Sequence, residues 1–77
     1  MYLILVYDIS VERVSKVLKV CRKYLTWVQN SVFEGEISES DLIKLRDELE
    51  QIIESSDSVT IYMLRTTTYM EKEHLGQ

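Results

Sequence analysis

One carboxylate closes the apolar run at the start of the chain. Asp8 follows residues 2–7, which read Tyr-Leu-Ile-Leu-Val-Tyr. A structural interpretation is that Asp8 ends a strand or caps the helix that follows. A functional interpretation needs a second copy of the chain, because two neighbouring carboxylates provide the oxygen ligands that Mg²⁺ prefers, and the ion keeps several of its waters. Such a metal could bind a phosphate and activate water for phosphodiester hydrolysis.

A row of basic residues follows Asp8 in the next segment. Residues 10–25 carry five basic side chains and one acid, Glu12, whereas residues 34–57 carry nine acids and two basic residues. The spacing predicts a basic row along the solvent-exposed side of one helix, made of Arg13, Lys16, Lys19 and Lys23. A solvated helix face explains such a row without any function. In a two-fold dimer the row is duplicated, and two symmetric basic surfaces suit the phosphates of a duplex, despite a net charge of -4.

Other residue types that carry chemistry give no competing site. Cys21 is the only cysteine, so no internal disulfide forms, and its place in an apolar stripe indicates a buried thiol. A general-base role for His74, in the charged tail, is not expected. The first apolar run is shorter than the roughly 20 residues of a membrane helix, and we expect no signal peptide. We therefore expect a cytoplasmic protein with no membrane partner.

The apolar pattern predicts the two elements that position Asp8 and the basic row. Residues 1–8 are predicted to form a strand with apolar side chains on both faces. Apolar residues spaced by three and four then predict a helix over residues 11–24, with Ser10 as its cap.

The rest of the chain repeats these two kinds of element. The stretch 25–37 is β-prone with a turn in its middle, which indicates two short strands or one broken strand. Ser38 and Asp41 are typical of a helix start. The apolar positions of that second helix are Leu42, Leu45, Leu49, Ile52 and Ile53. Residues 59–64 are predicted to form the last core strand.

The order of the elements predicts the fold. A βαββαβ order favours an α+β, ferredoxin-like sandwich with both helices on one sheet face, and we assign residues 1–64 to this domain. The other face would be uncovered, yet the first and last strands are apolar on both sides, so an isolated chain would expose a large apolar patch. We therefore predict a homodimer packed through its sheet faces. The tail, residues 65–77, begins β-prone and is expected to add a strand that crosses to the partner subunit.

Three segments together resemble one known family. They are Tyr7-Asp8-Ile9, then Val28-Gln29-Asn30-Ser31-Val32-Phe33-Glu34-Gly35-Glu36, and finally Val59-Thr60-Ile61-Tyr62-Met63-Leu64. In this order and spacing they resemble the CRISPR-associated protein two family, the smaller of the two near-universal CRISPR adaptation proteins. The resemblance implies a ferredoxin-like homodimer that bridges the CRISPR integrase and holds double-stranded DNA for insertion as a new spacer. It also implies a metal-dependent endonuclease acting on RNA or double-stranded DNA.

The resemblance implies roles for individual residues as well. Asp8 matches the family's metal-binding aspartate, so the expected cofactor is Mg²⁺ held by Asp8 of both subunits. Tyr7, Arg13 and Phe33 match positions of that site or its surroundings. The tail is expected to contact the integrase.

Reasoning from the residues alone leaves the function open. It favours an adaptor over an enzyme, because one carboxylate per chain makes a sparse catalytic site. One alternative is a stand-alone toxin-type ribonuclease of related fold, which would act on RNA without an integrase. Another is a ferredoxin-like regulatory module that binds a small ligand at its dimer interface, although the chain has no glycine-rich ligand loop.

Overall fold

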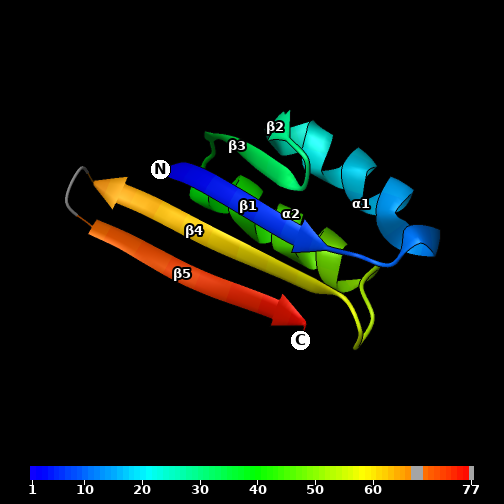
Figure 1. Cartoon of the computed structure of the whole chain (residues 1–77). Coiled ribbons are helices and arrows are strands. Elements are labelled where there is room, and N and C mark those ends of the chain that lie inside the picture. The colour runs from blue at the N-terminus through cyan, green and yellow to red at the C-terminus, as the bar shows by residue number, and fades with distance from the viewer. Residues whose placement is uncertain (67–68, 77) are drawn as a thin grey trace.

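Two helices and five strands make up the computed structural model, which describes residues 1–66 and 69–76 (Figure 1). The helices are α1 (Val11–Tyr24) and α2 (Glu39–Glu50). The strands are β1 (Tyr2–Asp8), β2 (Thr26–Gln29), β3 (Val32–Glu36), β4 (Ser58–Thr66) and β5 (Tyr69–Gly76). The predicted βαββαβ order is therefore confirmed, and a further C-terminal strand follows it.

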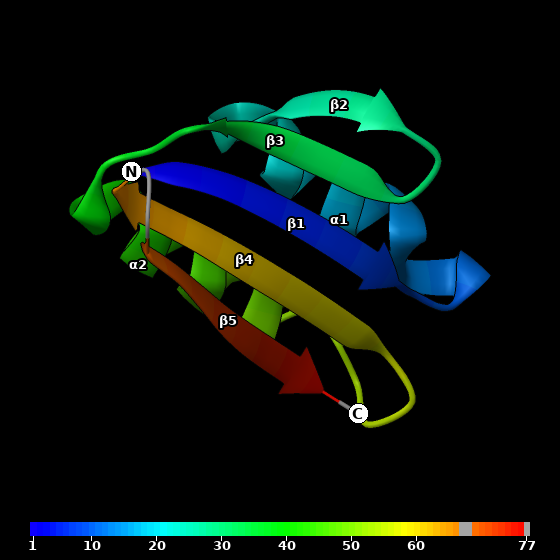
Figure 2. The same cartoon turned by 60° about the vertical axis from the view of Figure 1, so that its left-hand side comes forward.

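The five strands form one antiparallel sheet in the order β2-β3-β1-β4-β5. Both helices lie on the same face of this sheet, so the molecule has two layers (Figure 2). The core between the layers is apolar, and its fully buried side chains include Leu3, Leu5, Phe33, Leu45 and Ile61. This is the α+β ferredoxin-like arrangement expected from the sequence. Neither of the described helices is long and apolar enough to cross a membrane.

The second helix starts where the sequence predicts and ends earlier. The Ser38 hydroxyl accepts a hydrogen bond from the backbone N–H of Asp41 at 3.1 Å, which caps α2. The apolar spacing placed Ile52 and Ile53 in this helix, and that was wrong. Both lie in the following turn, where their backbone N–H groups donate to the carbonyl of Leu49 at 3.0 Å, and both still pack against the core.

The sheet face turned away from the helices carries apolar side chains at its centre. Because side chains alternate along a strand, the burial of Leu3 and Leu5 against the helices places Ile4 and Val6 on the opposite side. Tyr62 of β4 pairs with Ile4 and lies on that same side. We call this surface the helix-free face, and its apolar members include Tyr2, Ile4, Val6, Val32, Tyr62 and Leu64. Dimerisation through the helix-free face stays a prediction.

The C-terminal strand β5 lies at the edge of the sheet, beside β4 of the same chain. Ser58 pairs with Gly76, and Arg46 of α2 donates from Nε to the Glu73 carboxylate at 2.7 Å, which ties the strand to the helix layer. An extra C-terminal strand is thus confirmed. That this strand crosses to a partner subunit stays a prediction. Residues 67, 68 and 77 of the predicted tail lie outside the described residues.

Candidate functional site

Asp8 is the last residue of β1 and lies on the helix-free face. Its neighbour Tyr7 points toward the helix layer, and the Asp8 backbone pairs with Ser58 at the start of β4. The Asp8 side chain is exposed. Within residues 1–66 and 69–76, no side chain or backbone group forms a hydrogen bond or an ion pair with its carboxylate. Asp8 thus ends the strand, as one form of the structural interpretation has it, and within the described residues its side chain does not cap the helix that follows.

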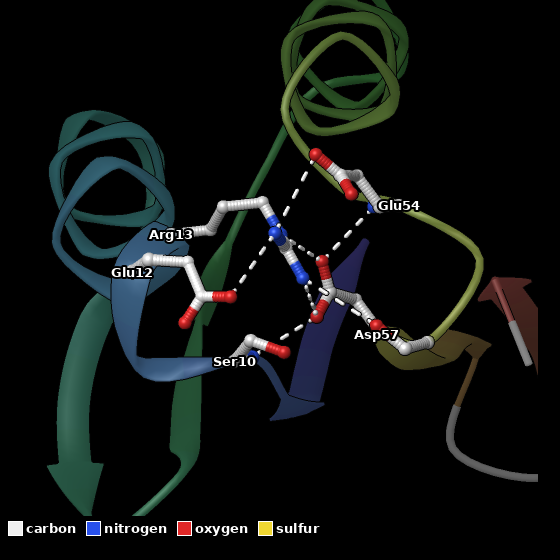
Figure 3. A network of polar contacts seen from close by, with 6 residues as sticks. Ser10, Glu12, Arg13, Glu54 and Asp57 are labelled. Carbon is white, nitrogen blue, oxygen red and sulfur yellow. Dashed lines mark hydrogen bonds and ion pairs between the residues drawn. The ribbon is translucent and has the colours of Figure 1, made fainter.

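A buried carboxylate, Asp57, holds the start of α1 instead (Figure 3). Its Oδ1 accepts the backbone N–H of Ser10 at 2.9 Å, and its Oδ2 accepts the backbone N–H of Glu54 at 2.9 Å. Arg13 donates from Nε to Oδ2 at 2.5 Å and from Nη2 to Oδ1 at 3.0 Å. Ser10 stands at the predicted cap position, yet its side chain makes no capping hydrogen bond. The backbone of Ser10 is fixed from outside the helix, by the turn before β4.

Asp57 has no exposed surface, so its charge depends on these donors. The Arg13 guanidinium, together with the N–H of Ser10, holds the pKa of the Asp57 carboxyl well below its usual range. The hydrogen bonds between Arg13 and Asp57 in turn raise the pKa of Arg13, so both side chains stay charged. We call Asp57, Arg13, Ser10 and Glu54 the Asp57 network.

Arg13 does not belong to the basic row that the sequence predicted. It precedes the buried Val17 by four residues, so it lies on the side of α1 that packs rather than on the solvent side. Its side chain is only 15% exposed and also approaches Glu54 at 3.4 Å and Glu12 at 3.6 Å. Its charge is therefore balanced within the chain.

The lysines of the predicted row remain at the surface, and they divide into two groups. Lys16 and Lys19 are exposed, and neither makes an ion pair within residues 1–66 and 69–76. Lys23 donates to the carboxylate of Glu48 on α2, which also accepts the hydroxyl of Tyr24. The Lys23 hydrogen bond, with that of Tyr24, lowers the pKa of Glu48. Lys16 and Lys19 are thus the members of the row whose charge is open to a ligand.

Tyr7 and Phe33 lie on the helix side of the sheet, opposite the Asp8 carboxylate. Phe33 is fully buried, and its ring centroid is 6.2 Å from that of Tyr7. The Tyr7 hydroxyl donates to the carbonyl of Asn30 at 3.4 Å. These contacts join the end of β1 to the β2–β3 turn. Neither side chain is placed to touch a ligand of Asp8 on the helix-free face.

One chain alone provides a sparse set of metal ligands. Among the described residues, no group of three or more His, Cys, Asp or Glu side chains comes together in a way that could hold a metal. Asp8 contributes an exposed carboxylate, a ligand type that suits Mg²⁺ when water fills the remaining positions. A second protein ligand would have to come from another copy of the chain.

Sequence reasoning missed the role of Asp57 completely. The sequence showed it only as one acid in the polar stretch 54–58, before the last strand. Its partners Ser10 and Arg13 are 47 and 44 residues away, so no local spacing could reveal the network. The one available signal was its position shortly before the last predicted strand.

Comparison with known sequences gives a consistent family. Residues 1–72 match the family described as CRISPR associated protein Cas2. A protein of Dictyoglomus turgidum named CRISPR-associated endoribonuclease Cas2 is 53% identical over 77 residues, which cover 99% of this chain and 88% of that protein. The protein of the same name from Pyrococcus furiosus is 54% identical over 67 residues, which cover 86% of this chain and 79% of that protein.

Comparison with solved structures agrees with the sequence matches. A crystal structure of Cas2 superimposes with a TM-score of 0.84 at 48% identity, over 90% of this chain and 79% of that one. The crystal structure of Streptococcus pyogenes Cas2 superimposes with a TM-score of 0.74 at 34% identity, over 83% of this chain and 86% of that one.

Proposed function

The chain belongs to the Cas2 family of CRISPR-associated proteins, and we propose that it acts as a homodimer in CRISPR adaptation, the acquisition of new spacers. In this proposal the dimer binds double-stranded nucleic acid, bridges the CRISPR integrase, and hydrolyses phosphodiesters with magnesium at a pair of Asp8 side chains. The observation that carries the nuclease part is the exposed Asp8 carboxylate, which forms no bond within the described residues and lies on the helix-free face. Bridging of the integrase rests on family membership alone.

The dimer is supported by the chemistry of the helix-free face. Ile4 and Tyr62 lie side by side at its centre, and Val6 keeps 36% of its surface exposed. Covering these side chains with the same face of a second copy would remove apolar surface from water. Because Asp8 lies in the same strand and on the same face, such a dimer brings two copies of Asp8 to one interface.

The proposed role of Asp8 follows from its carboxylate, which bonds to no other described residue and is therefore open to a metal ion. Each chain would hold the ion through one carboxylate, with water filling the other positions. When bound, Mg²⁺ supplies Lewis acidity toward a phosphate oxygen and lowers the pKa of a coordinated water. The chain's own part is to keep a charged carboxylate at a fixed place, and the pairing of Asp8 with Ser58 supports this.

Nucleic acid is proposed to bind along α1. Lys16 and Lys19 offer two exposed charges one helical turn apart, with Lys23 a turn further on. Contacts of this kind neutralise backbone phosphates without reading the bases. Arg13 is not part of this surface, because its guanidinium is bound to Asp57. The names of the relatives favour RNA as a cleavage substrate, while the adaptation role calls for binding of double-stranded DNA.

A paired assay of cleavage and binding tests the proposal. The wild-type chain, Asp8→Ala and Asp47→Ala are each given duplex DNA and single-stranded RNA, with magnesium or with EDTA. Asp47 is a matched control because it is another exposed acid, on α2. We expect magnesium-dependent cleavage by wild type and Asp47→Ala and none by Asp8→Ala.

The other outcomes separate the parts of the proposal. If all three proteins bind duplex DNA in a salt-sensitive way and none cuts, the nuclease part is wrong and an adaptor remains. If wild type cuts RNA and does not bind duplex DNA, the adaptation role is wrong and a stand-alone ribonuclease takes its place.

A further inference from the structure

Asp57 is the polar side chain that the described part of the chain buries completely, and it lies next to the proposed site. We propose that Asp57, bound by Arg13, is a positioning residue that fixes the turn leading out of β1 and so sets where the Asp8 carboxylate lies. This inference rests on the proposed function, because it takes Asp8 to be the metal ligand. It assigns Asp57 no contact with metal or substrate.

The Asp57 network holds the segment around Asp8 from both sides. Ser58, the residue after Asp57, pairs with Asp8 in the sheet. Ser10, two residues after Asp8, donates its backbone N–H to Asp57 Oδ1 at 2.9 Å (Figure 3). The Asp57 side chain therefore bonds the backbone two residues after the proposed ligand, and the residue that follows Asp57 pairs with that ligand in the sheet.

The end of β1 needs this support because only β4 pairs with it as far as Asp8, while on the β3 side the last backbone bond runs from the N–H of Tyr7 to the carbonyl of Ser31 at 3.1 Å. The register with β3 ends at Val6 and Val32, whereas the register with β4 continues to Asp8 and Ser58. Without the bond between Ser10 and Asp57, the segment that follows Asp8 would lack its hydrogen bond to the turn before β4. A ligand displaced by about 1 Å binds and catalyses much more weakly, so such support has a functional consequence.

The turn that carries Asp57 is itself tightly confined. The backbone N–H of Glu54 donates to Oδ2, and Gly76 at the end of β5 approaches from the other side. A Cβ atom added at Gly76 would lie 2.1 Å from the carbonyl oxygen of Asp57, and Gly76 has a φ of +89°, so this position suits glycine. The turn is thus held by Arg13 of α1, by its own bonds between Glu54 and Asp57, and by the last strand.

Fold stability alone is a weak explanation for such a network. Replacing a buried ion pair with apolar side chains of similar volume is often neutral or stabilising, so stability gives little reason to place one here. What Asp57 provides, and apolar packing does not, is a pair of directed hydrogen bonds to the backbone, one from Ser10 and one from Glu54. Ser10 lies two residues after the proposed metal ligand.

The test compares metal binding in variants that lose one carboxylate charge each. Asp57→Asn removes the charge at the proposed positioning residue. Glu48→Gln is the matched control, because Glu48 also joins α2 to α1, through Lys23 and Tyr24 at the far end of α1. Ten residues of helix separate Arg13 from Lys23, about 15 Å along the axis. Binding of Mn²⁺, a probe of the magnesium site, is measured by electron paramagnetic resonance well below the melting temperature of each protein.

We expect Asp57→Asn to weaken Mn²⁺ binding about tenfold, in line with substitutions that disturb the orientation of a metal ligand. Glu48→Gln should bind as wild type does, even where its melting temperature falls. Arg13→Lys keeps the charge and loses the two-pronged bond, so it should weaken binding in the same direction by a smaller factor. It also provides the test if Asp57→Asn does not fold.

Two results would overturn the inference, and they are distinguishable. If Asp8→Ala loses Mn²⁺ binding while Asp57→Asn and Arg13→Lys retain wild-type affinity, the positioning role is wrong and the proposed site survives. If the wild type shows no Mn²⁺ binding that depends on Asp8, the proposed site fails and the positioning role fails with it.

Discussion

Asp8 and Asp57 lie beside each other in the fold and have opposite surroundings. Asp57 directly precedes Ser58, the residue that pairs with Asp8. Asp57 is fully buried and accepts four hydrogen bonds, whereas the exposed Asp8 carboxylate accepts none within the described residues. A carboxylate has about four lone-pair sites, so those of Asp57 are filled by the chain itself and those of Asp8 are left for a ligand.

The difference shows that the residue type alone does not assign a role. Both residues are aspartates at the end of a β-strand or just before one, and the sequence singled out the exposed one because it closes an apolar run. The buried one is defined by partners far away in the chain. In this account Asp8 binds the metal directly, whereas Asp57 fixes the backbone near it. Substitution of Asp57 should therefore lower the stability of the fold, and substitution of Asp8 should not.

The largest expected effect is on stability and separates the two residues. Asp57→Ala should lower the melting temperature by about 10 °C or more, because it leaves Arg13 and two backbone N–H groups without their acceptor. Asp8→Ala should leave the melting temperature within about 2 °C of wild type, since the Asp8 carboxylate bonds to no described residue. Differential scanning calorimetry at neutral pH measures both. Equal decreases in the two variants would contradict the comparison.

A second prediction concerns acid. The pKa of Asp57 is lower in the folded chain than in the unfolded chain, so its contribution to stability is present above the unfolded value of about 3.9. The contribution is lost progressively as the pH falls below that value toward the lower pKa of the folded state. The melting temperatures of wild type and Asp57→Asn should therefore differ at pH 6 and converge as the pH is lowered from about 4 to 2. A gap that stays constant over this range would show that the charge of Asp57 is not what stabilises the fold.

The smallest expected effect extends the same comparison to the basic residues. Lys16 and Lys19 make no ion pair in the described chain, whereas Arg13 is bound to Asp57. The double variant Lys16→Gln/Lys19→Gln should bind duplex DNA several-fold more weakly, with a salt dependence that falls by about 1 for each phosphate that a lysine no longer neutralises. Lys44→Gln, an exposed lysine on α2, is the control and should bind as wild type does. Filter-binding titrations at several salt concentrations measure the affinity and its salt dependence. If the salt dependence of the double variant equals that of wild type, these two lysines do not form the DNA-binding surface.

Most of the fold was predictable because its signals are local. The apolar spacing gave α1 its full extent, the Ser38 cap gave the start of α2, and the apolar run gave the first strand, which ends at Asp8. The predicted end of α2 was wrong. Ile52 and Ile53 pack against the core from the turn after the helix, and the apolar spacing alone does not distinguish that turn from a further helical turn.

The site was only partly predictable. Asp8 was found because it interrupts an apolar run, which is visible in the sequence. Arg13 was placed among the lysines because its type and rough spacing matched theirs. In the structure Arg13 is instead bound to Asp57, in the turn before β4, and only folding brings these two residues together.

The central claim is that the proposed site needs Asp8 from two chains, and subunit mixing tests it most directly. Wild type and Asp8→Asn are unfolded together, refolded at equal amounts, and assayed for magnesium-dependent cleavage at the total concentration used for pure wild type. If each site uses both carboxylates, only dimers of two wild-type chains are active, and the rate should fall to about a quarter. A rate of about one half would show that each chain acts alone, and would contradict the shared site.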